Sequence, residues 1–411
     1  MLHLKDIEKA KSVLAGVSEV TPLVFSRSLS EMTGCQVYLK MENLQKTGSF
    51  KVRGAYAKIA GLSAAERKAG VFAASAGNHA QGVAFAARKF RVRSTIVMPQ
   101  SSSIAKLLAT QSYGARTILW GQSFEEAFQR ARELALQRRG TFIHAFDDRA
   151  VMAGQGTIAL EILDALPQVD AVLVPVGGGG LLAGISTALK ETRARIRVLG
   201  VEAAGAASLA LSRRAGHRVT LSRIHTLADG IALKSVGRLT YPILKKYVDD
   251  VVTVREDSIA RAITLLLERK KVVVEGAGAV PLAALLEGVP SLRGKKVVLV
   301  LSGGNIDITL LDRIIEKGLV TSGRLMRVEV ELQDVPGALS GLTHLIAEGR
   351  ANILQISHDR LSQDVPIGST KVDLALETRG HDHIQEILKI LAFKGYSAVL
   401  LGSGRGAHHG P

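Results

Sequence analysis

The sequence predicts an α/β fold, with two open, twisted and mainly parallel sheets that carry helices on both faces, followed by a ferredoxin-like βαββαβ unit. Three observations lead to this prediction. Short apolar segments alternate with helical patterns through the first half of the chain, and the second half repeats this alternation. Beyond about residue 323 the strand-like segments become polar on one side, which indicates strands that are buried on only one face.

The first half of the chain carries the first series of alternating strands and helices. Residues 1–35 read as two helices with an extended turn at 21–23, where Pro22 breaks the first helix. A strand at 37–40 and a helix over 50–62 follow. Strands are then expected at 70–75, 94–99, 116–120 and 142–144, and helices at 80–90, 102–112 and 123–138.

The second half continues in the same way and then changes character. Its expected helices are 154–165, 181–190, 256–270 and 278–287, and its strands are 171–176, 197–202, 251–254 and 296–301. In the last part we expect strands 326–331, 352–357, 370–377 and 398–401, with helices ending near 348 and spanning 381–394. The predicted domains are therefore 1–320, with a small subdomain at about 53–150, then 325–403, with a disordered tail at 404–411.

Composition excludes several classes of protein. The chain has 411 residues, a single cysteine (Cys35), and neither a run long and apolar enough for a membrane span nor an apolar signal core, so we expect a cytoplasmic protein. The net charge of +16 is scattered and aromatic residues make up only 4%, which argues against nucleic-acid binding. No Cys/His spacing typical of a metal site occurs.

Lys51 is the first candidate for chemistry. It lies in the first turn of the helix expected over 50–62, where the positive end of the helix dipole and a partly apolar setting disfavour the ammonium form. A lysine that has lost its proton can bond covalently to a carbonyl cofactor. The alternative is a solvated lysine at a helix start, and this segment alone does not separate the two.

Three strand-to-helix turns are candidate ligand sites, because open α/β sheets bind ligands beyond the carboxyl ends of their strands. The four glycines 177–180 form a pattern typical of a phosphate cradle. Ser302 can hydrogen-bond a ring nitrogen, and the turn at 75–79 offers amides to a carboxylate and the Asn78 side chain to a phenolic oxygen. The alternatives are a mobile glycine turn and ordinary helix caps, one by Asn78 and one by Ser302 or Asn305.

Taken together, these segments resemble the pyridoxal-phosphate enzymes of the tryptophan-synthase-β fold (fold type II), and most closely the threonine dehydratase (threonine ammonia-lyase) family. The resemblance covers residues 1 to about 320 and rests on the segments 40–55, 75–82, 175–181 and 301–305, which occur in the family's order and spacing. Residues 326–401 resemble a single ACT domain, with 334–339 matching its ligand loop.

The resemblance implies a role for each matching residue. Lys51 would hold pyridoxal 5'-phosphate covalently and, as a free amine, take the α-proton of the substrate. Phe50 would pack on the pyridine face, Asn78 would bind the ring hydroxyl oxygen and Ser302 the ring nitrogen. The cofactor phosphate would bind the amides of Gly177, Gly178, Gly179, Gly180 and Leu181. The substrate carboxylate would bind the turn formed by Ser75, Ala76, Gly77, Asn78 and His79.

The implied reaction is the deaminating dehydration of L-threonine to 2-oxobutanoate and ammonia, and of L-serine to pyruvate. The serine racemases of this family have a serine at the position of Ala76, and that serine acts as acid and base on the second face of the substrate. Because an alanine carries no proton, the resemblance favours elimination over racemisation. A serine racemase, a serine or hydroxyaspartate dehydratase, and an amino-acid sensor with a vestigial catalytic domain are the alternatives. The stretch Glu202, Ala206 and Ser208 resembles the family's cation site but lacks its usual Asp, and we predict no metal.

The ACT resemblance implies control by a small amino acid such as isoleucine or valine. The expected contacts are Gly337, Ala338, Leu339 and Asn352, at an interface between two such units. A purely dimerising module is the alternative. The family also implies a homodimer or homotetramer, and either a biosynthetic role, in making isoleucine, or a catabolic one.

Overall fold

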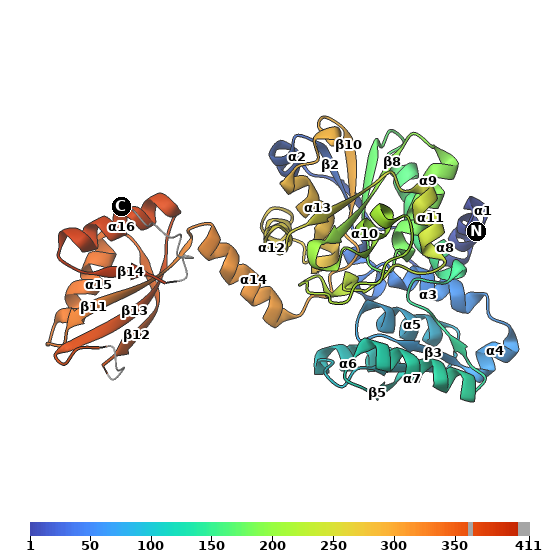
Figure 1. Ribbon diagram of the computed structural model, residues 1–411, viewed down its shortest axis with the longest axis horizontal. Helices are drawn as coiled ribbons and strands as arrows, with labels where there is room; N and C mark the ends of the chain where they lie inside the picture. The colour runs from blue at the N-terminus through green and yellow to red at the C-terminus, as the bar shows by residue number, and fades with distance from the viewer. Residues whose placement is uncertain (361–364, 402–411) are drawn as a thin grey trace. The chain divides into compact units, whose positions relative to one another are not determined.

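The predicted fold class is confirmed by a computed structural model that describes residues 1–360 and 365–401. Two sheets rich in parallel pairs are followed by a third, antiparallel sheet (Figure 1). The chain divides into two compact units, the first Met1–Ile306 and the second beginning at Asp307. The tail expected at 404–411 lies outside the described residues.

The large sheet has six strands, and all its neighbouring pairs are parallel except the first. In spatial order these are β1 (Leu23–Phe25), β2 (Gln36–Lys40), β10 (Lys296–Val300), β7 (Ala171–Pro175), β8 (Arg197–Ala203) and β9 (Asp250–Val254). Every residue of β7 is buried, as expected of a continuous apolar strand covered on both faces. The short β1 occupies the place where only an extended turn was predicted, because it pairs with β2 from the edge.

Helices cover both faces of the large sheet (Figure 1). One group consists of α1 (Leu4–Leu14), α8 (Arg149–Ala165), α9 (Gly180–Thr192) and α11 (Thr240–Tyr247). The other includes α2 (Arg27–Thr33), α12 (Glu256–Leu265) and α13 (Gly276–Glu287), with α10 (Ser208–Ala215) beside β8 and β9. Helix α8 begins earlier than the expected residue 154, because the Asp148 carboxylate caps it by accepting from the amides of Ala150 and Val151. The helix predicted over 256–270 ends as a π-turn at Leu266–Lys270.

The small sheet consists of four parallel strands, in the order β5 (Arg116–Leu119), β4 (Ser94–Met98), β3 (Val71–Ala74) and β6 (Thr141–Phe142). Its helices are α4 (Ala64–Ala69), α5 (Asn78–Lys89), α6 (Ile104–Ser112) and α7 (Phe124–Gln137). Successive residues of β4 face opposite ways: Ile96 packs in the core with α5, and Val97 packs with α7.

Helix α3 (Lys51–Ala60) joins the two sheets, because it contacts α5 on one side and α8 on the other. Its contact with α8 depends on two glycines. A Cβ on Gly54 would lie 2.7 Å from the Val151 carbonyl oxygen, and one on Gly154 would lie 2.5 Å from the Arg53 carbonyl oxygen. The backbones of the two helices therefore touch, which places the start of α3 between the sheets.

A buried ionic network anchors the same helix. The Arg53 guanidinium, 1% exposed, donates to both carboxylate oxygens of Glu42 at 2.8 Å and to those of Glu161 at 2.5 and 3.0 Å. Lys40 donates to Glu161 as well, at 2.5 Å. Two cations and two carboxylates thus compensate one another away from water, and they tie α3 to β2 and α8.

The second unit has the predicted βαββαβ order. It contains β11 (Leu325–Gln333), α15 (Ala338–Glu348), β12 (Asn352–Asp359), β13 (Ser369–Glu377), α16 (His381–Phe393) and β14 (Ala398–Leu400), in the antiparallel order β12-β13-β11-β14. Val328, Val330 and Leu332 of β11 are buried, as their alternation predicts. Helix α14 (Ile308–Thr321) belongs to this unit, although residues up to 320 were expected in the first. Among the described residues, no helix is both long and apolar enough to cross a membrane.

Candidate active site

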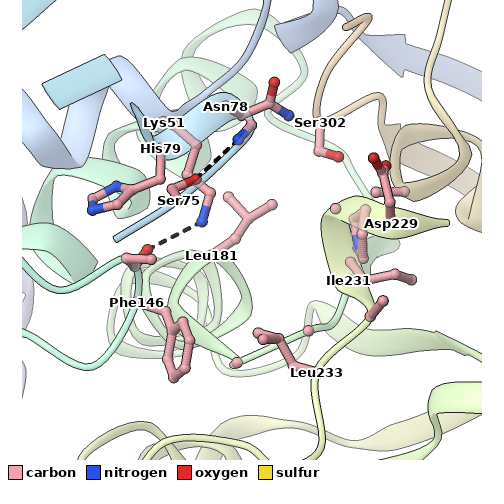
Figure 2. A pocket seen from close by; sticks show the side chains of 18 of the residues that line it. Lys51, Ser75, Asn78, His79, Phe146, Leu181, Asp229, Ile231, Leu233 and Ser302 are labelled. Atoms are coloured by element: carbon pink, nitrogen blue, oxygen red, sulfur yellow. Dashed lines mark hydrogen bonds between the residues drawn. The ribbon is translucent and has the colours of Figure 1, made fainter. Parts of the chain in front are cut away.

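A cavity of about 320 Å³ lies where strands of both the large and the small sheet end. All the residues that the sequence suggests for cofactor and substrate line it: Phe50, Lys51, Ser75, Ala76, Gly77, Asn78, His79, Gly177, Gly178, Gly179, Gly180, Leu181 and Ser302. Figure 2 shows Asn78 and Ser302 near one another at one end, with Phe146 and Leu233 at the other. Segments far apart in the sequence therefore meet at one site.

Lys51 is the first residue of α3, and its amine faces the cavity (Figure 2). The Nζ atom donates to the carbonyl oxygen of Ala145 at 3.1 Å and lies 5.1 Å from the centroid of the Phe50 ring. Burial lowers the pKa of Lys51 to about 8, although the carboxyl of Glu275 opposes this by favouring the charged form. A substantial fraction of this amine is therefore neutral at mildly alkaline pH.

The glycine turn follows β7 and opens α9, with Gly179 in the left-handed region at a φ of 88°. Side chains do not fit here: a Cβ on Gly178 would lie 2.3 Å from the Phe146 ring, and one on Gly180 would lie 2.8 Å from the Phe146 carbonyl oxygen. The Gly178 carbonyl accepts from the Thr240 hydroxyl at 2.8 Å. The backbone is thus held open, and the first N–H groups of α9 lack partners within the helix, which suits an anion.

The turn at 75–79 leads from β3 into α5, which begins at Asn78, two residues before the expected start. The amide of Gly77 donates to the Ser75 hydroxyl at 3.1 Å, so that amide already has a partner. The Nε2 atom of His79 donates to the Ile143 carbonyl at 2.9 Å, and the ring is turned away from Lys51 (Figure 2). Burial, and then the charge of Lys51, lower the pKa of His79 to about 3, so its ring is neutral.

Asn78 is hydrogen-bonded to Glu275, a residue that the sequence did not reveal as part of the site. The Asn78 Nδ2 atom donates to both carboxylate oxygens of Glu275, at 2.8 and 2.9 Å. Ser302 is buried directly beyond β10, and its carbonyl accepts from the Phe50 amide at 3.1 Å, which ties this turn to the start of α3. The only sequence signal for Glu275 is an isolated acid after the apolar run 272–274.

Other lining residues were also missed. Phe146 follows Ala145, whose carbonyl accepts a hydrogen bond from the Lys51 amine. Lys106 on α6 also lines the cavity and forms a 2.8 Å ion pair with Asp229. These positions lie in segments without a recognisable motif, so nothing in the sequence indicates them.

Glu202 is buried and accepts from the amides of Leu209 and Ala210, both at 2.8 Å. Burial raises the pKa of Glu202 to about 7. Within the described residues, no group of three or more His, Cys, Asp or Glu side chains is arranged to hold a metal ion.

The expected regulatory residues lie far apart within the second unit. Gly337 (φ 90°), Ala338 and Leu339 are at the start of α15, beyond the end of β11. Asn352 begins β12 and pairs with Glu377, which also pairs with the first residue of β11. The two sets are thus at opposite ends of the sheet, roughly 26 Å apart at about 3.3 Å per residue. A single unit does not bring them together.

The cavity fits pyridoxal 5'-phosphate. A buried lysine of lowered pKa suits an aldehyde, a turn with no room for a Cβ suits a phosphate, and Asn78 and Ser302 supply polar groups for the ring. The family description "pyridoxal-phosphate dependent enzyme" matches residues 15–303. The chain therefore belongs to this family, whose cofactor is pyridoxal phosphate.

Within that family the chain is similar to enzymes that act on threonine. It is 50% identical over 402 residues to the L-threonine ammonia-lyase of Thermotoga maritima, covering 98% of this chain and 100% of that enzyme. A solved structure of the processed threonine deaminase isoform 2 of Solanum lycopersicum has a TM-score of 0.72 and 38% identity, covering 76% of this chain and 91% of that one. The solved structure of maize serine racemase has a TM-score of 0.73 and 33% identity, and the match covers 78% of this chain and 98% of that one.

Proposed function

We propose that the protein is an L-threonine ammonia-lyase, which converts L-threonine to 2-oxobutanoate and ammonia and L-serine to pyruvate. The observation that carries this proposal is the 50% identity, over nearly the whole of both chains, to a threonine ammonia-lyase. The meeting of Lys51 with three ligand-binding turns in one cavity supports it.

The residues of the cavity account for binding. The amides of Gly177 to Leu181 would hold the phosphate of the cofactor at the start of α9, where the helix dipole adds attraction. The first turn of α5 offers its amides to the substrate carboxylate. His79 adds no charge there, because its side chain is neutral and donates to Ile143.

Lys51 moves the proton. Bound pyridoxal phosphate withdraws electrons from the α-carbon of the attached amino acid, which makes the α-proton acidic. The Lys51 amine accepts that proton at Nζ, and a pKa near 8 suits a base that is both available and strong enough. Ser302 would hydrogen-bond the ring nitrogen of the bound cofactor without placing a full charge on it. The electron pair left on the α-carbon forms a double bond to the β-carbon as the bond to the β-hydroxyl breaks, and the hydroxide is protonated and leaves as water. Water then hydrolyses the released enamine to the 2-oxo acid and ammonia, and this elimination is favoured over transamination.

Ala76 separates elimination from racemisation. Racemisation needs a second group that delivers a proton to the opposite face of the substrate, and a methyl side chain carries no proton. Ala76 lines the cavity in the turn where the serine of racemases is expected. We therefore rank serine racemase below threonine dehydratase.

Substrate comparison tests this function. The purified holoenzyme is assayed for 2-oxo acid formation from L-threonine, L-serine and 3-hydroxyaspartate, and for D-serine formation from L-serine. We expect the largest kcat/KM with L-threonine and no net D-serine, and Lys51→Ala should abolish all of these activities. A preference for 3-hydroxyaspartate, or substantial D-serine, would support the alternative dehydratase or racemase.

We further propose that the second unit is an ACT regulatory domain that binds isoleucine or valine between two copies in a homodimer or homotetramer. Its βαββαβ order supports this, and so does the placement of Gly337 and Asn352 at opposite ends of one sheet, because two copies are needed to combine them. Light scattering gives the oligomeric state, and calorimetry with each amino acid measures binding to wild type and Asn352→Ala. A stable dimer that binds neither ligand would indicate a purely dimerising module.

A further inference from the structure

Glu275 is a buried acid whose position has no explanation in the binding roles described so far. It is 3% exposed, precedes the first residue of α13 and lines the cavity. Within the described part of the chain it forms no ion pair with a lysine, arginine or histidine. A buried carboxylate without such a partner is costly, so its hydrogen bonds indicate what it does.

These hydrogen bonds orient a side-chain amide. Asn305 Nδ2 donates to the Thr47 carbonyl at 2.8 Å and to Asn78 Oδ1 at 2.7 Å, while Asn78 Nδ2 donates to both oxygens of Glu275. A carbonyl at one end and a carboxylate at the other can only accept, so neither amide is free to flip. One N–H of Asn78 can serve both Glu275 oxygens, which leaves the second N–H as a donor for a ligand.

Glu275 also packs against the turn that contains Ser302. Its amide donates to the Gly303 carbonyl at 3.0 Å, and a Cβ on Gly303 would lie 2.5 Å from Glu275 Oε1. One residue therefore touches both turns expected to face the polar atoms of the cofactor ring. Because Gly303 has no side chain, the Glu275 carboxyl can occupy the space that a Cβ at position 303 would need.

We propose that Glu275 is a positioning residue of the cofactor site, whose carboxylate holds Asn78 with Nδ2 directed at the phenolic oxygen of pyridoxal phosphate. This inference rests on the proposed function, because it assumes that the cofactor ring lies between Asn78 and Ser302. Glu275 itself transfers no proton to substrate in this role.

The position of Glu275 also makes the site sensitive to pH. Burial raises the pKa of Glu275 to about 7, the hydrogen bond from Asn78 lowers it, Asp229 raises it, and Lys106 and Lys51 lower it. Below pH 7 the carboxyl gains a proton, so one of the two oxygens that accept from Asn78 becomes a hydroxyl and only the other remains a good acceptor. The orientation of Asn78 should then loosen, and the absorption of the bound cofactor should change through pH 7.

The experiment measures the absorption spectrum of the holoenzyme and its affinity for pyridoxal phosphate from about pH 5.5 to 9. This range brackets the pKa of Glu275. Wild type is compared with Glu275→Gln, which keeps the shape without an ionisable group, and with Glu275→Leu. We expect Glu275→Gln to lose the spectral step near pH 7 with only a few-fold change in Kd. Glu275→Leu should bind pyridoxal phosphate on the order of tenfold more weakly, through loss of a charge-assisted hydrogen bond.

A matched control is Glu202→Gln, which removes another buried carboxyl whose pKa burial raises to about 7 but which does not line the cavity. Its spectral step should be that of wild type. The inference is overturned if Glu275→Gln keeps the step, or if wild type has none. It is also overturned if a folded Glu275→Leu binds the cofactor as wild type does. If Glu275→Leu does not fold, Glu275→Gln alone decides. A wild type that binds no pyridoxal phosphate would instead refute the proposed function.

Discussion

The ring of Phe146 occupies the space that a side chain on Gly178 would need, at 2.3 Å from its ideal Cβ. Phe146 follows Ala145, whose carbonyl accepts from the Lys51 amine. A two-residue segment beyond β6 thus meets both the glycine turn and the lysine. The segment sets the width of the cavity between the two groups expected to hold opposite ends of the cofactor.

Replacing Gly178 with alanine should weaken cofactor binding. The added methyl must displace the Phe146 ring or the turn, at a cost of roughly 1–3 kcal/mol, which corresponds to about a fivefold to 150-fold increase in Kd. Fluorescence titration of the apoprotein with pyridoxal phosphate measures this. Gly61→Ala is the control, because Gly61 has a φ of −81° and its nearest neighbouring atom would be 3.6 Å away. Equal affinities for both variants would contradict the prediction.

The lowered pKa of Lys51 should be visible in the pH dependence of cofactor attachment. Because that pKa is about 8 and not 10.5, neutral amine forms as the pH rises through 8. Attachment to the apoprotein should therefore speed up between about pH 7 and 9. The apoprotein is exposed briefly to pyridoxal phosphate and reduced with borohydride, and its intact mass then gives the fraction that carries the cofactor. The variant Lys51→Arg measures the background attachment to surface lysines. A midpoint above pH 10 would mean that burial does not perturb this amine.

Loss of Arg53 should strongly destabilise the first unit. Arg53→Met leaves the buried carboxylate of Glu42 and the largely buried carboxylate of Glu161 beside a single remaining lysine, at a cost of roughly 3–5 kcal/mol. Urea unfolding of wild type and Arg53→Met measures this loss of unfolding free energy. Arg27→Met removes an exposed pair with Glu31 and should change the unfolding free energy by less than about 1 kcal/mol. Comparable losses in both variants would show that the buried network is not what anchors α3.

His79 should make the protein sensitive to acid. Its folded pKa of about 3 is depressed below the ordinary 6.5, so its stabilising contribution is present above pH 6.5 and is lost as the pH falls toward 3. The unfolding free energy of wild type should fall more steeply between pH 6 and 4 than that of His79→Gln, by up to about 1.4 kcal/mol per pH unit. His217→Gln, at an exposed position, is the control and should follow wild type. Parallel curves for wild type and His79→Gln would argue against a neutral buried ring.

The sequence by itself determined the elements whose character is local. Strands β3 and β7 are apolar throughout, and β10 is apolar after its first residue, Lys296, because both faces of each strand are covered. Glycines 177–180 stand where a strand turns into a helix, so both patterns can be recognised without knowing their partners. The alternation of β11 likewise marks a strand with one buried face. Lys51, Asn78 and Ser302 could be proposed from such turns and from their resemblance to a family.

Only the tertiary structure decided which distant residues meet. Glu275 lies 197 positions from Asn78, and its role depends on a hydrogen bond that no local pattern encodes. The edge strand β1 forms because β2 offers an unpaired side, and helix α14 joins the second unit through contacts with β11. Gly337 and Asn352 stand at opposite ends of one sheet because the strand register places them there. Periodicity reports how each segment is buried, whereas long-range pairing depends on the packing of the whole fold.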